Sequence, residues 1–322
     1  MRRRVFIAAL GSAAAWPVLA RAQQQPIPVV GWLGAAPASS NASRLRGLRL
    51  GLRDVGYVEG TSVVIEFRWA ENPSQLPKLA AELAKREVAV IVTSGNAATR
   101  AAQIATQKIP IVFSAADDPV RLGYVASFNR PGGNMTGVSL ISGALGAKRL
   151  ELLRQLVPNA TVIAVLMNPN NPAEGTRDEQ ATARAVGQRI LVLDASTVIE
   201  IEQAFVAVVQ QRADALLVNA DSFFTAQREL LVTLAARHHL PAIYVWREFT
   251  EAGGLMSYGT SLSHSYHQMG VYVGRILKSE KPANLPVMQP TEFELVINLR
   301  TAKSLGLEIP PQLLARADEV IE

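Results

Sequence analysis

One unit recurs along this chain: an apolar segment without alternation, a short polar loop, and then the start of a helix. The clearest copy is Val88–Ala101, in which the strand Val88–Thr93 stops at Ser94-Gly95-Asn96 and a helix follows at once. Strands that are apolar on both faces are typical of parallel sheets covered by helices on both sides. Further copies turn into helices at Ser114, Asn168 and Asn219. The pattern predicts an α/β protein built from doubly wound parallel sheets.

A turn-rich segment, Phe128–Val138 with the sequence FNRPGGNMTGV, interrupts this alternation, which then restarts. Because a chain of 322 residues also exceeds the usual size of one domain, we expect two lobes. Further crossings between them are expected at Gly253–Gly259 and near Pro290–Asn298. The expected fold is therefore two doubly wound parallel-sheet lobes joined by a three-crossing hinge. Residues 23–137 and 260–290 are assigned to the first lobe, and residues 138–259 and 291–322 to the second.

The first 22 residues have the features of a cleavable export signal. Met1-Arg2-Arg3-Arg4 is basic, Val5–Ala15 is apolar, and Ala20-Arg21-Ala22 matches an A-x-A cleavage site. The segment Arg3–Ile7 also fits a twin-arginine signal, and the apolar stretch is too short to span a membrane. The sequence therefore predicts a periplasmic protein, exported by a signal of the twin-arginine or the general secretory type.

Removal of this leader changes what the charge indicates. The full chain carries a formal net charge of +5, but four of its arginines lie in the leader, which contains no acid. The mature protein is then close to neutral, so its charge does not indicate a nucleic-acid partner. The chain also has no cysteine. That excludes a disulfide framework, a thiolate metal site, a cysteine nucleophile and a lipid-anchored cysteine.

The loops that follow the strands are the expected ligand site, because open α/β sheets bind ligands beyond the carboxyl ends of their strands. If two such sheets face each other, these loops line one cleft between the lobes. The candidate ligand-binding residues are Trp32, Leu33, Gly34, Ser94, Gly95, Asn96, Ala97, Ser114, Ala115, Asp117, Asp118, Asn168, Asn170, Asn219, Asp221, Ser222, Phe223, Tyr244 and Tyr258.

These side chains suit a small zwitterion. The helix that begins near Ser94-Gly95-Asn96 presents unpaired N–H groups and the positive end of its dipole, which favour a carboxylate. Ser94 or Asn96 is expected to cap this helix. An acid among Asp117, Asp118 and Asp221 would hold an ammonium group. Aromatic faces for an apolar or ring-bearing side chain come from Trp32, Phe223, Phe224, Tyr244 and Trp246.

Each of these residues also has a purely structural interpretation. Ser, Asn and Asp after a strand are ordinary helix caps, and Asp118-Pro119 is a usual start of a helix. Phe223 and Phe224 are adjacent at a helix start, so they cannot both face the same way, and either one fits a core position. Trp32 follows Gly31 in an apolar strand, which also favours the core. The expected site therefore depends on the loops as a set.

Signatures of catalysis are sparse. His264 and His267 are three residues apart at a helix start, which would place two metal ligands on one face, but no carboxylate accompanies them at ligand spacing. The chain has no G-x-S-x-G, P-loop or G-x-G-x-x-G motif. The sequence therefore predicts a binding protein without catalytic residues, metal or cofactor. A hydrolase that uses cleft carboxylates is the alternative that the sequence leaves open.

Four segments resemble one protein family. They are Phe128–Val138, Ala252–Gly259 with the sequence AGGLMSYG, Phe293–Leu299 with FELVINL, and Leu314–Ile321 with LARADEVI. They are similar to the tryptophan- and tyrosine-type substrate-binding proteins of ABC transporters, and the likeness extends over essentially the whole mature chain. The resemblance implies the type I periplasmic binding protein fold, with three hinge strands and the ligand between the lobes.

The same resemblance implies a function. Relatives bind aromatic amino acids, with the carboxylate at the loop that matches Ser94–Ala97 and the ammonium near acidic loop residues. The chain would thus capture a small ligand, with an aromatic amino acid as the leading expectation, and deliver it to an ABC permease in the inner membrane. It would act as a monomer, without a nucleic-acid partner. A periplasmic sensor that presents its ligand to a receptor kinase is the second alternative.

Overall fold

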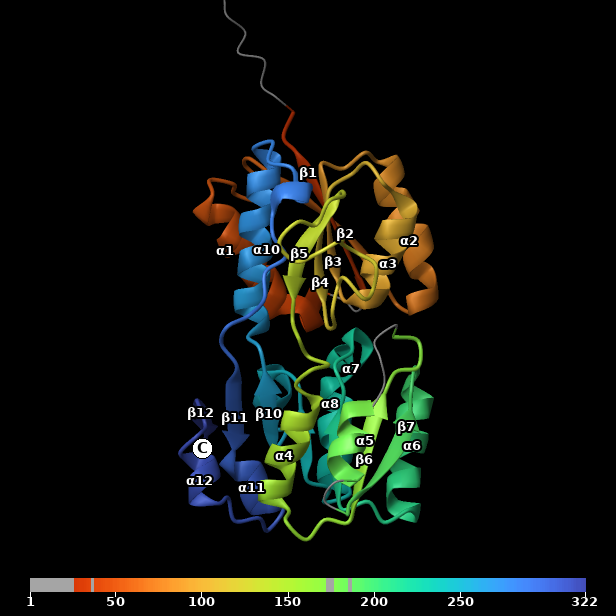
Figure 1. Ribbon diagram of the computed structural model, residues 1–322, viewed down its shortest axis with the longest axis vertical. Helices are drawn as coiled ribbons and strands as arrows, with labels where there is room; N and C mark the ends of the chain where they lie inside the picture. The colour runs from red at the N-terminus through yellow and green to blue at the C-terminus, as the bar shows by residue number, and fades with distance from the viewer. Residues whose placement is uncertain (1–25, 36–37, 172–176, 185–186) are drawn as a thin grey trace, which may run out of the picture.

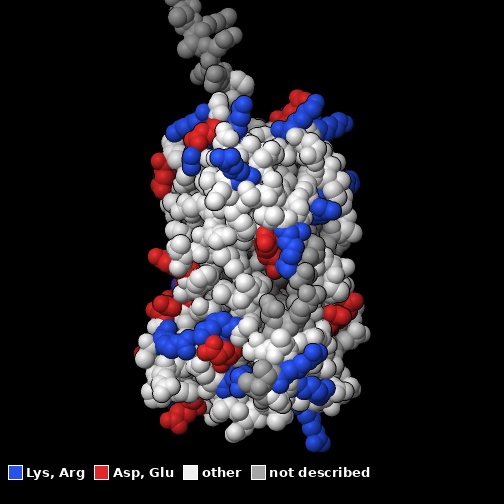
Figure 2. Space-filling model, viewed as in Figure 1, with Lys and Arg blue, Asp and Glu red and all other residues white. Residues whose placement is uncertain are grey.

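The computed structural model describes residues 26–35, 38–171, 177–184 and 187–322, and within them two α/β lobes stacked along the long axis of the molecule (Figure 1). The leader expected over residues 1–22 lies outside the described residues. Among the helices of the described ranges, none is both long and apolar enough to cross a membrane. On the face shown in Figure 2, basic and acidic side chains are interspersed over both lobes.

The first lobe contains a parallel sheet of strand order β2-β1-β3-β4-β5. The strands are β1 (Val29–Ala35), β2 (Val64–Ala70), β3 (Val90–Ser94), β4 (Ile111–Ala115) and β5 (Met135–Ser139). The helices are η1 (Ala38–Asn41), α1 (Ala42–Asp54), η2 (Pro73–Gln75), α2 (Leu76–Lys85), α3 (Asn96–Ala105), α10 (Leu262–Leu277) and η3 (Pro282–Asn284). Helices α1 and α10 cover one face of the sheet and α2 and α3 the other (Figure 1).

This sheet is buried because β3, β4 and β5 are covered along their whole length, as the absence of alternation in β3 and β4 predicts. Its register sets the site. Ser94 at the end of β3 is paired with Gly34 of β1 on one side and with Ser114 of β4 on the other. Three strands therefore end side by side, with small or hydroxyl side chains at the edge that faces the second lobe.

Helix α10 belongs to the first lobe, although it follows strands of the second lobe in the chain. It packs against α1 at very short range, since a Cβ on Gly51 would lie 1.9 Å from the backbone oxygen of His267. A Cβ on Gly270 would likewise lie 2.2 Å from the oxygen of Leu48. Glycine is the one residue that permits this approach. The packing brings Tyr266, on α10, under the edge of the sheet.

The second lobe contains a sheet of order β12-β11-β10-β9-β8-β6-β7, parallel except that β11 runs antiparallel to β10. Its strands are β6 (Val162–Met167), β7 (Arg189–Asp194), β8 (Ala215–Val218), β9 (Ala242–Tyr244), β10 (Met256–Gly259), β11 (Glu294–Asn298) and β12 (Glu319–Ile321). Its helices are α4 (Gly146–Leu156), α5 (Arg177–Arg184), α6 (Val198–Gln210), α7 (Ser222–Ala226), α8 (Arg228–Arg237), α9 (Arg247–Glu251), α11 (Leu299–Ser304) and α12 (Pro311–Leu314).

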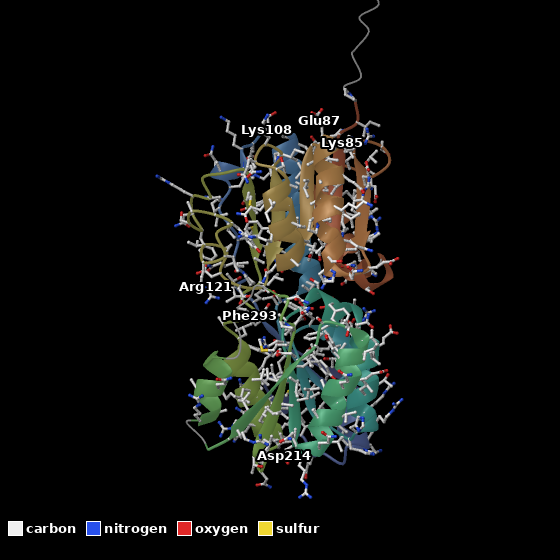
Figure 3. The ribbon with its side chains drawn as sticks, turned by 90° about the vertical axis from the view of Figure 1, so that its right-hand side faces the viewer. Lys85, Glu87, Lys108, Arg121, Asp214 and Phe293 are labelled. Carbon is white, nitrogen blue, oxygen red and sulfur yellow. The ribbon has the colours of Figure 1, made fainter. Side chains whose placement is uncertain are left out.

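The chain passes between the lobes three times: after β5, between β10 and α10, and between η3 and β11 (Figure 1). This is the expected two-lobe fold with three crossings. Figure 3 shows Lys85, Glu87 and Lys108 at the outer end of the first lobe and Asp214 at the outer end of the second. These charged residues therefore lie at the ends of the lobes that are farthest from the contact between the lobes.

Several local expectations were wrong. The segment that reads as a turn and crossing contains strand β5, because Gly137 lies in a strand where a Cβ would come within 2.0 Å of the oxygen of Phe113. The segment Gly253–Gly259, expected as a crossing, contains strand β10, and the chain crosses to the first lobe directly after it. In these segments, pairing with a buried neighbouring strand overrides a glycine-rich local sequence.

Candidate functional site

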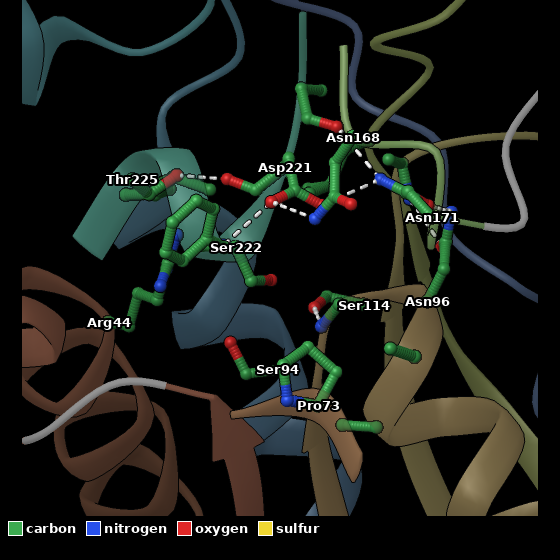
Figure 4. A pocket seen from close by; sticks show the side chains of 18 of the residues that line it. Arg44, Pro73, Ser94, Asn96, Ser114, Asn168, Asn171, Asp221, Ser222 and Thr225 are labelled. Atoms are coloured by element: carbon green, nitrogen blue, oxygen red, sulfur yellow. Dashed lines mark hydrogen bonds between the residues drawn. The ribbon is translucent and has the colours of Figure 1, made fainter. Parts of the chain in front are cut away.

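A cavity of about 50 Å³ lies between the lobes, where the carboxyl ends of the two sheets face each other (Figure 4). The lobes touch around it. The Nδ2 of Asn96 donates to the Oδ1 of Asn171 at 3.1 Å, and the Oγ of Ser43 donates to Glu248 at 2.7 Å. Side chains of both lobes therefore bound this small cavity.

The first-lobe wall is built from a chain of hydrogen bonds. The N–H of Gly95 donates to the Oγ of Ser114 at 3.2 Å, and Ser114 contacts the hydroxyl of Tyr266 at 2.8 Å. Tyr266 in turn donates to the Oγ of Ser94 at 2.9 Å. Because Ser94 accepts from Tyr266, its own hydroxyl is available to donate to a group in the cavity. Such chains polarise each other, which strengthens the terminal donor.

Helix α3 begins at this wall without a side-chain cap. Its N-cap is Gly95, with φ 88°, so the expectation that Ser94 or Asn96 caps the helix was wrong. The Oδ1 of Asn96 instead accepts from the N–H of Ala116 at 3.1 Å, and its Nδ2 faces Asp117 and Asn171. Glycine occupies the cap because a Cβ there would lie 2.2 Å from the Oγ of Ser222 on the opposite lobe. The first turn of α3 thus remains free of a competing anionic side chain.

Arg44 also lines the cavity, and sequence reasoning missed it. It is on the first turn of α1 and only 4% exposed; its Nη1 donates to the Oδ1 of Asn41 at 2.7 Å. Its guanidinium lies 5.9 Å from the centre of the Tyr266 ring. A cation in the first turn opposes the helix dipole. That is the sequence signal that would have marked this arginine as unusual.

The second-lobe wall is a network of amides around Asp221. The Oδ1 of Asp221 accepts from the backbone N–H groups of Phe223 at 2.8 Å and Phe224 at 3.2 Å, so Asp221 caps helix α7. The side chains of Asn168 and Asn171 each donate to it at 3.1 Å. Burial raises the pKa of this carboxyl, and the four hydrogen bonds oppose that rise.

Of the aromatic candidates, Phe223 and Trp246 line the cavity, whereas Phe224 is fully buried in the core. Neighbouring residues at a helix start are expected to face different ways, and these two do. Trp32 and Tyr244 are also fully buried. Trp32 packs against Tyr266, with ring centres 5.5 Å apart, and so supports the cavity from below.

The cavity brings together ten of the candidate residues from the sequence: Ser94, Gly95, Asn96, Ala97, Ser114, Asn168, Asn170, Asp221, Ser222 and Phe223. The remaining candidates do not line it: Trp32, Leu33, Gly34, Ala115, Asp117, Asp118, Asn219, Tyr244 and Tyr258. For the residues that lie in strands the reason is direction, since alternate residues of a strand point to opposite faces of the sheet.

Three of these residues illustrate the difference. Asp117 is buried behind Asn96, and Asp118 is exposed and accepts from the N–H of Val120 at 2.8 Å, so it caps a turn. Tyr258 lies in the second lobe against Phe293, with ring centres 6.3 Å apart. Figure 3 shows Phe293 near the level at which the lobes meet.

His264 and His267, the two metal-ligand candidates of the sequence, stack on each other with ring centres 6.3 Å apart. The Nε2 of His267 is 2.7 Å from a carboxylate oxygen of Asp54. Within the described ranges, no group of three or more His, Asp or Glu side chains is arranged to hold a metal ion. The pair is therefore explained by the contact between α10 and α1.

The sequence matches the family model of ABC transporter substrate binding proteins over residues 37–321. The chain belongs to this family. A tyrosine-binding protein of Clostridioides difficile (strain R20291) is 26% identical over 266 residues, which are 82% of this chain and 76% of the relative.

Solved structures of similar proteins cover nearly the whole chain. A conserved domain protein from Vibrio cholerae is 26% identical, with a TM-score of 0.84 over 91% of this chain and 99% of that one. An ABC domain from Streptococcus pneumonia in complex with L-Trp is 25% identical, with a TM-score of 0.82 and the same coverage. Members of this substrate-binding family share the type I periplasmic binding protein fold, which this chain has.

Proposed function

We propose that this protein captures a small carboxylate-bearing ligand between its lobes and delivers it to an ABC permease of the inner membrane. An amino acid with an aromatic side chain is the leading ligand class, in keeping with the tyrosine- and tryptophan-binding relatives. The observation that carries the proposal is the cavity itself: hydrogen-bond donors of the first lobe face it, beside the aromatic side chains of Phe223 and Trp246.

Binding then works by closure. A ligand that contacts both lobes favours the closed arrangement by its differential affinity for it, and the closed form docks on the permease. The contact between Asn96 and Asn171 would form as the lobes meet. The protein makes and breaks no covalent bond in this scheme. We further propose that it is a periplasmic monomer, exported after cleavage near Ala22, with lobes of residues 23–137 with 260–290 and 138–259 with 291–322.

A thermal-shift screen of the exported protein against amino acids, aromatic acids and short carboxylates tests the binding step. A ligand that binds only the folded state raises the melting temperature by an amount set by its concentration and Kd. A selective rise with Trp, Tyr or Phe supports the leading class. If no member of a broad panel changes the melting temperature of protein freed of co-purified ligand, the proposed function is wrong.

The double variant Ser94→Ala with Asn96→Ala tests the location of the site. We expect ligand binding to weaken by about 1–3 kcal/mol, the range for hydrogen bonds to a charged group. Ser127→Ala with Asn134→Ala is the matched control, because these side chains bond to backbone oxygens in the turn-rich segment of the first lobe. Unchanged affinity in the first double variant, measured by calorimetry, would place the ligand elsewhere.

A further inference from the structure

We propose that Arg44 is the residue that recognises the charge of the ligand, and that the site selects for a carboxylate and not for an α-amine. The ligand class is then organic acids with an apolar or aromatic body, whether or not they carry an amino group. This inference rests on the proposed function and narrows it. The argument for this inference compares the hydrogen-bond partners of Arg44 and Asp221, the two charged side chains that line the cavity.

Arg44 is a buried cation without an anion. Among the side chains described at residues 26–34, 40–171, 180–184 and 187–322, no carboxylate lies within 4.0 Å of its guanidinium. Its neighbours are the amide oxygen of Asn41 and the ring face of Tyr266, and neither neutralises a full charge. Burying a charge is costly unless it is paired. A bound anion would supply the missing partner.

The surroundings of Arg44 do not explain it as a structural residue. Its position in the first turn of α1 is unfavourable for a cation. Arg149 is equally buried, but its guanidinium donates to the backbone oxygens of Ser142 at 2.7 Å and Tyr258 at 3.5 Å and so links the segments beside the hinge. The hydrogen bond from Arg44 to Asn41 stays within one turn and links no distant segments.

The other charged group, Asp221, is already occupied. It accepts four hydrogen bonds, two from backbone N–H groups and two from the amides of Asn168 and Asn171. An ionised carboxylate offers about four lone-pair sites. Oδ1 accepts three of these bonds and Oδ2 one, so an ammonium group would have to share Oδ2 with the amide of Asn171, which holds the loop after β6.

The donors that remain available suit a carboxylate. Arg44 presents a planar fork that matches the two oxygens of a carboxylate, and the hydroxyl of Ser94 lies on the same first-lobe wall. Figure 4 shows Arg44 on the opposite side of the cavity from Asn96 and Asn171, with Ser94 between them in this view. The free donors therefore come from the first lobe, and the acidic group of the second lobe is satisfied before any ligand binds.

Matched probes test this inference without any variant. L-tryptophan, indole-3-propionate and tryptamine share the indole ring and differ in charge, and L-leucine, 4-methylpentanoate and isopentylamine form an aliphatic set. By calorimetry on the exported protein, we expect the amino acid and the amine-free acid of a set to bind within about tenfold of each other. We expect the amine without a carboxylate not to bind. Binding of an amino acid without binding of its amine-free acid overturns the inference and leaves the proposed function standing. Failure of every probe overturns both.

Variants of Arg44 test its role. We expect Arg44→Met to lower the affinity for the acid and for the amino acid by about 10- to 100-fold, because a hydrogen bond to a charged group is lost. Arg44→Lys should retain part of the affinity. The ligand-free Arg44→Met protein should melt at or above the wild-type temperature, because an unpaired buried charge is removed. A ligand-free protein that melts several degrees lower, or an acid that binds Arg44→Met as tightly as wild type, overturns the assignment.

Discussion

The two walls of the cavity differ in how their polar groups are paired. On the first lobe, Ser94 ends a chain of hydrogen bonds and α3 begins without a side-chain cap. Arg44 has no acid beside it among the side chains that the structure describes. On the second lobe, Asp221 and two asparagines satisfy each other. Groups that are left unpaired in a protein wall are available to a ligand, whereas paired groups define shape. The difference indicates that the first lobe recognises the ligand and the second lobe closes over it.

The largest effect is expected where the walls touch. Gly95→Ala adds a Cβ that would lie 2.2 Å from the Oγ of Ser222, so the Ser222 hydroxyl must turn away or the lobes must separate. We expect ligand affinity to fall by about 10-fold or more, that is at least ~1.4 kcal/mol. Calorimetry with the best ligand of the screen measures it.

Gly132→Ala is the matched control for this variant. Gly132 has a similar positive φ of 81°, but a Cβ there would make only ordinary contacts, with Ala126 at 3.6 Å and the oxygen of Arg130 at 3.8 Å. Both variants place an alanine at a positive φ, which lowers stability by about 1–3 kcal/mol. Only Gly95→Ala should lose binding. Equal affinities in the two variants would mean that the lobes do not meet at Gly95 when ligand binds.

A smaller effect is expected from the hydrogen-bond chain of the first lobe. Tyr266→Phe removes the hydroxyl that joins Ser114 to Ser94, so the Ser94 proton loses its fixed direction. We expect a loss of about 0.5–1.5 kcal/mol in binding, the net value of one hydrogen bond. Tyr272→Phe, on the same helix, removes a hydrogen bond to the backbone oxygen of Pro286 and should change stability but not affinity. If both variants bind equally well, the chain plays no part in recognition.

The smallest effect concerns the second lobe and depends on pH. Burial raises the folded-state pKa of Asp221 above its usual 3.8, so its favourable contribution is complete below about pH 3.8 and is lost as the pH rises through the folded pKa. The unfolding free energy of wild type relative to Asp221→Asn should therefore fall as the pH rises from about 3.8 through the folded pKa of Asp221, and stay level at higher pH. Urea unfolding at several pH values measures this difference.

Asp214, at the outer end of the second lobe, should make stability depend on pH in the opposite direction from Asp221. Burial raises the pKa of Asp214. Hydrogen bonds from the N–H groups of Val162 and Thr161 and from the Thr161 hydroxyl outweigh this effect, so the folded pKa lies below 3.8. Its contribution is present above about pH 3.8 and is lost as the pH falls through the folded pKa. Wild type should thus lose stability relative to Asp214→Asn only in acid. Two variants with the same pH slope would contradict the assigned environments.

The amino-acid sequence by itself determined the architecture. Apolar strands without alternation must be covered on both faces, and with the helices between them this leaves parallel α/β lobes as the solution. The expected strand Val88–Thr93 overlaps β3, which runs from Val90 to Ser94. The loops at Ser94, Ser114 and Asn168 do line the cavity, because parallel strands end at the same edge of their sheet.

Only the tertiary structure decided which side chains face the ligand. Tyr266 and Ser94 are 172 residues apart in the chain, and they meet because glycines let α10 approach α1. Tyr244 is an aromatic residue at the end of a strand near the cleft, yet it is fully buried in the core, and nothing local in its sequence fixes that direction. The place of Arg44 in the first turn of α1 is visible in the sequence, but its burial beside the ring of Tyr266 is not. Burial and pairing are properties of packed segments, so the unpaired charge that distinguishes the first lobe becomes visible only in the folded chain.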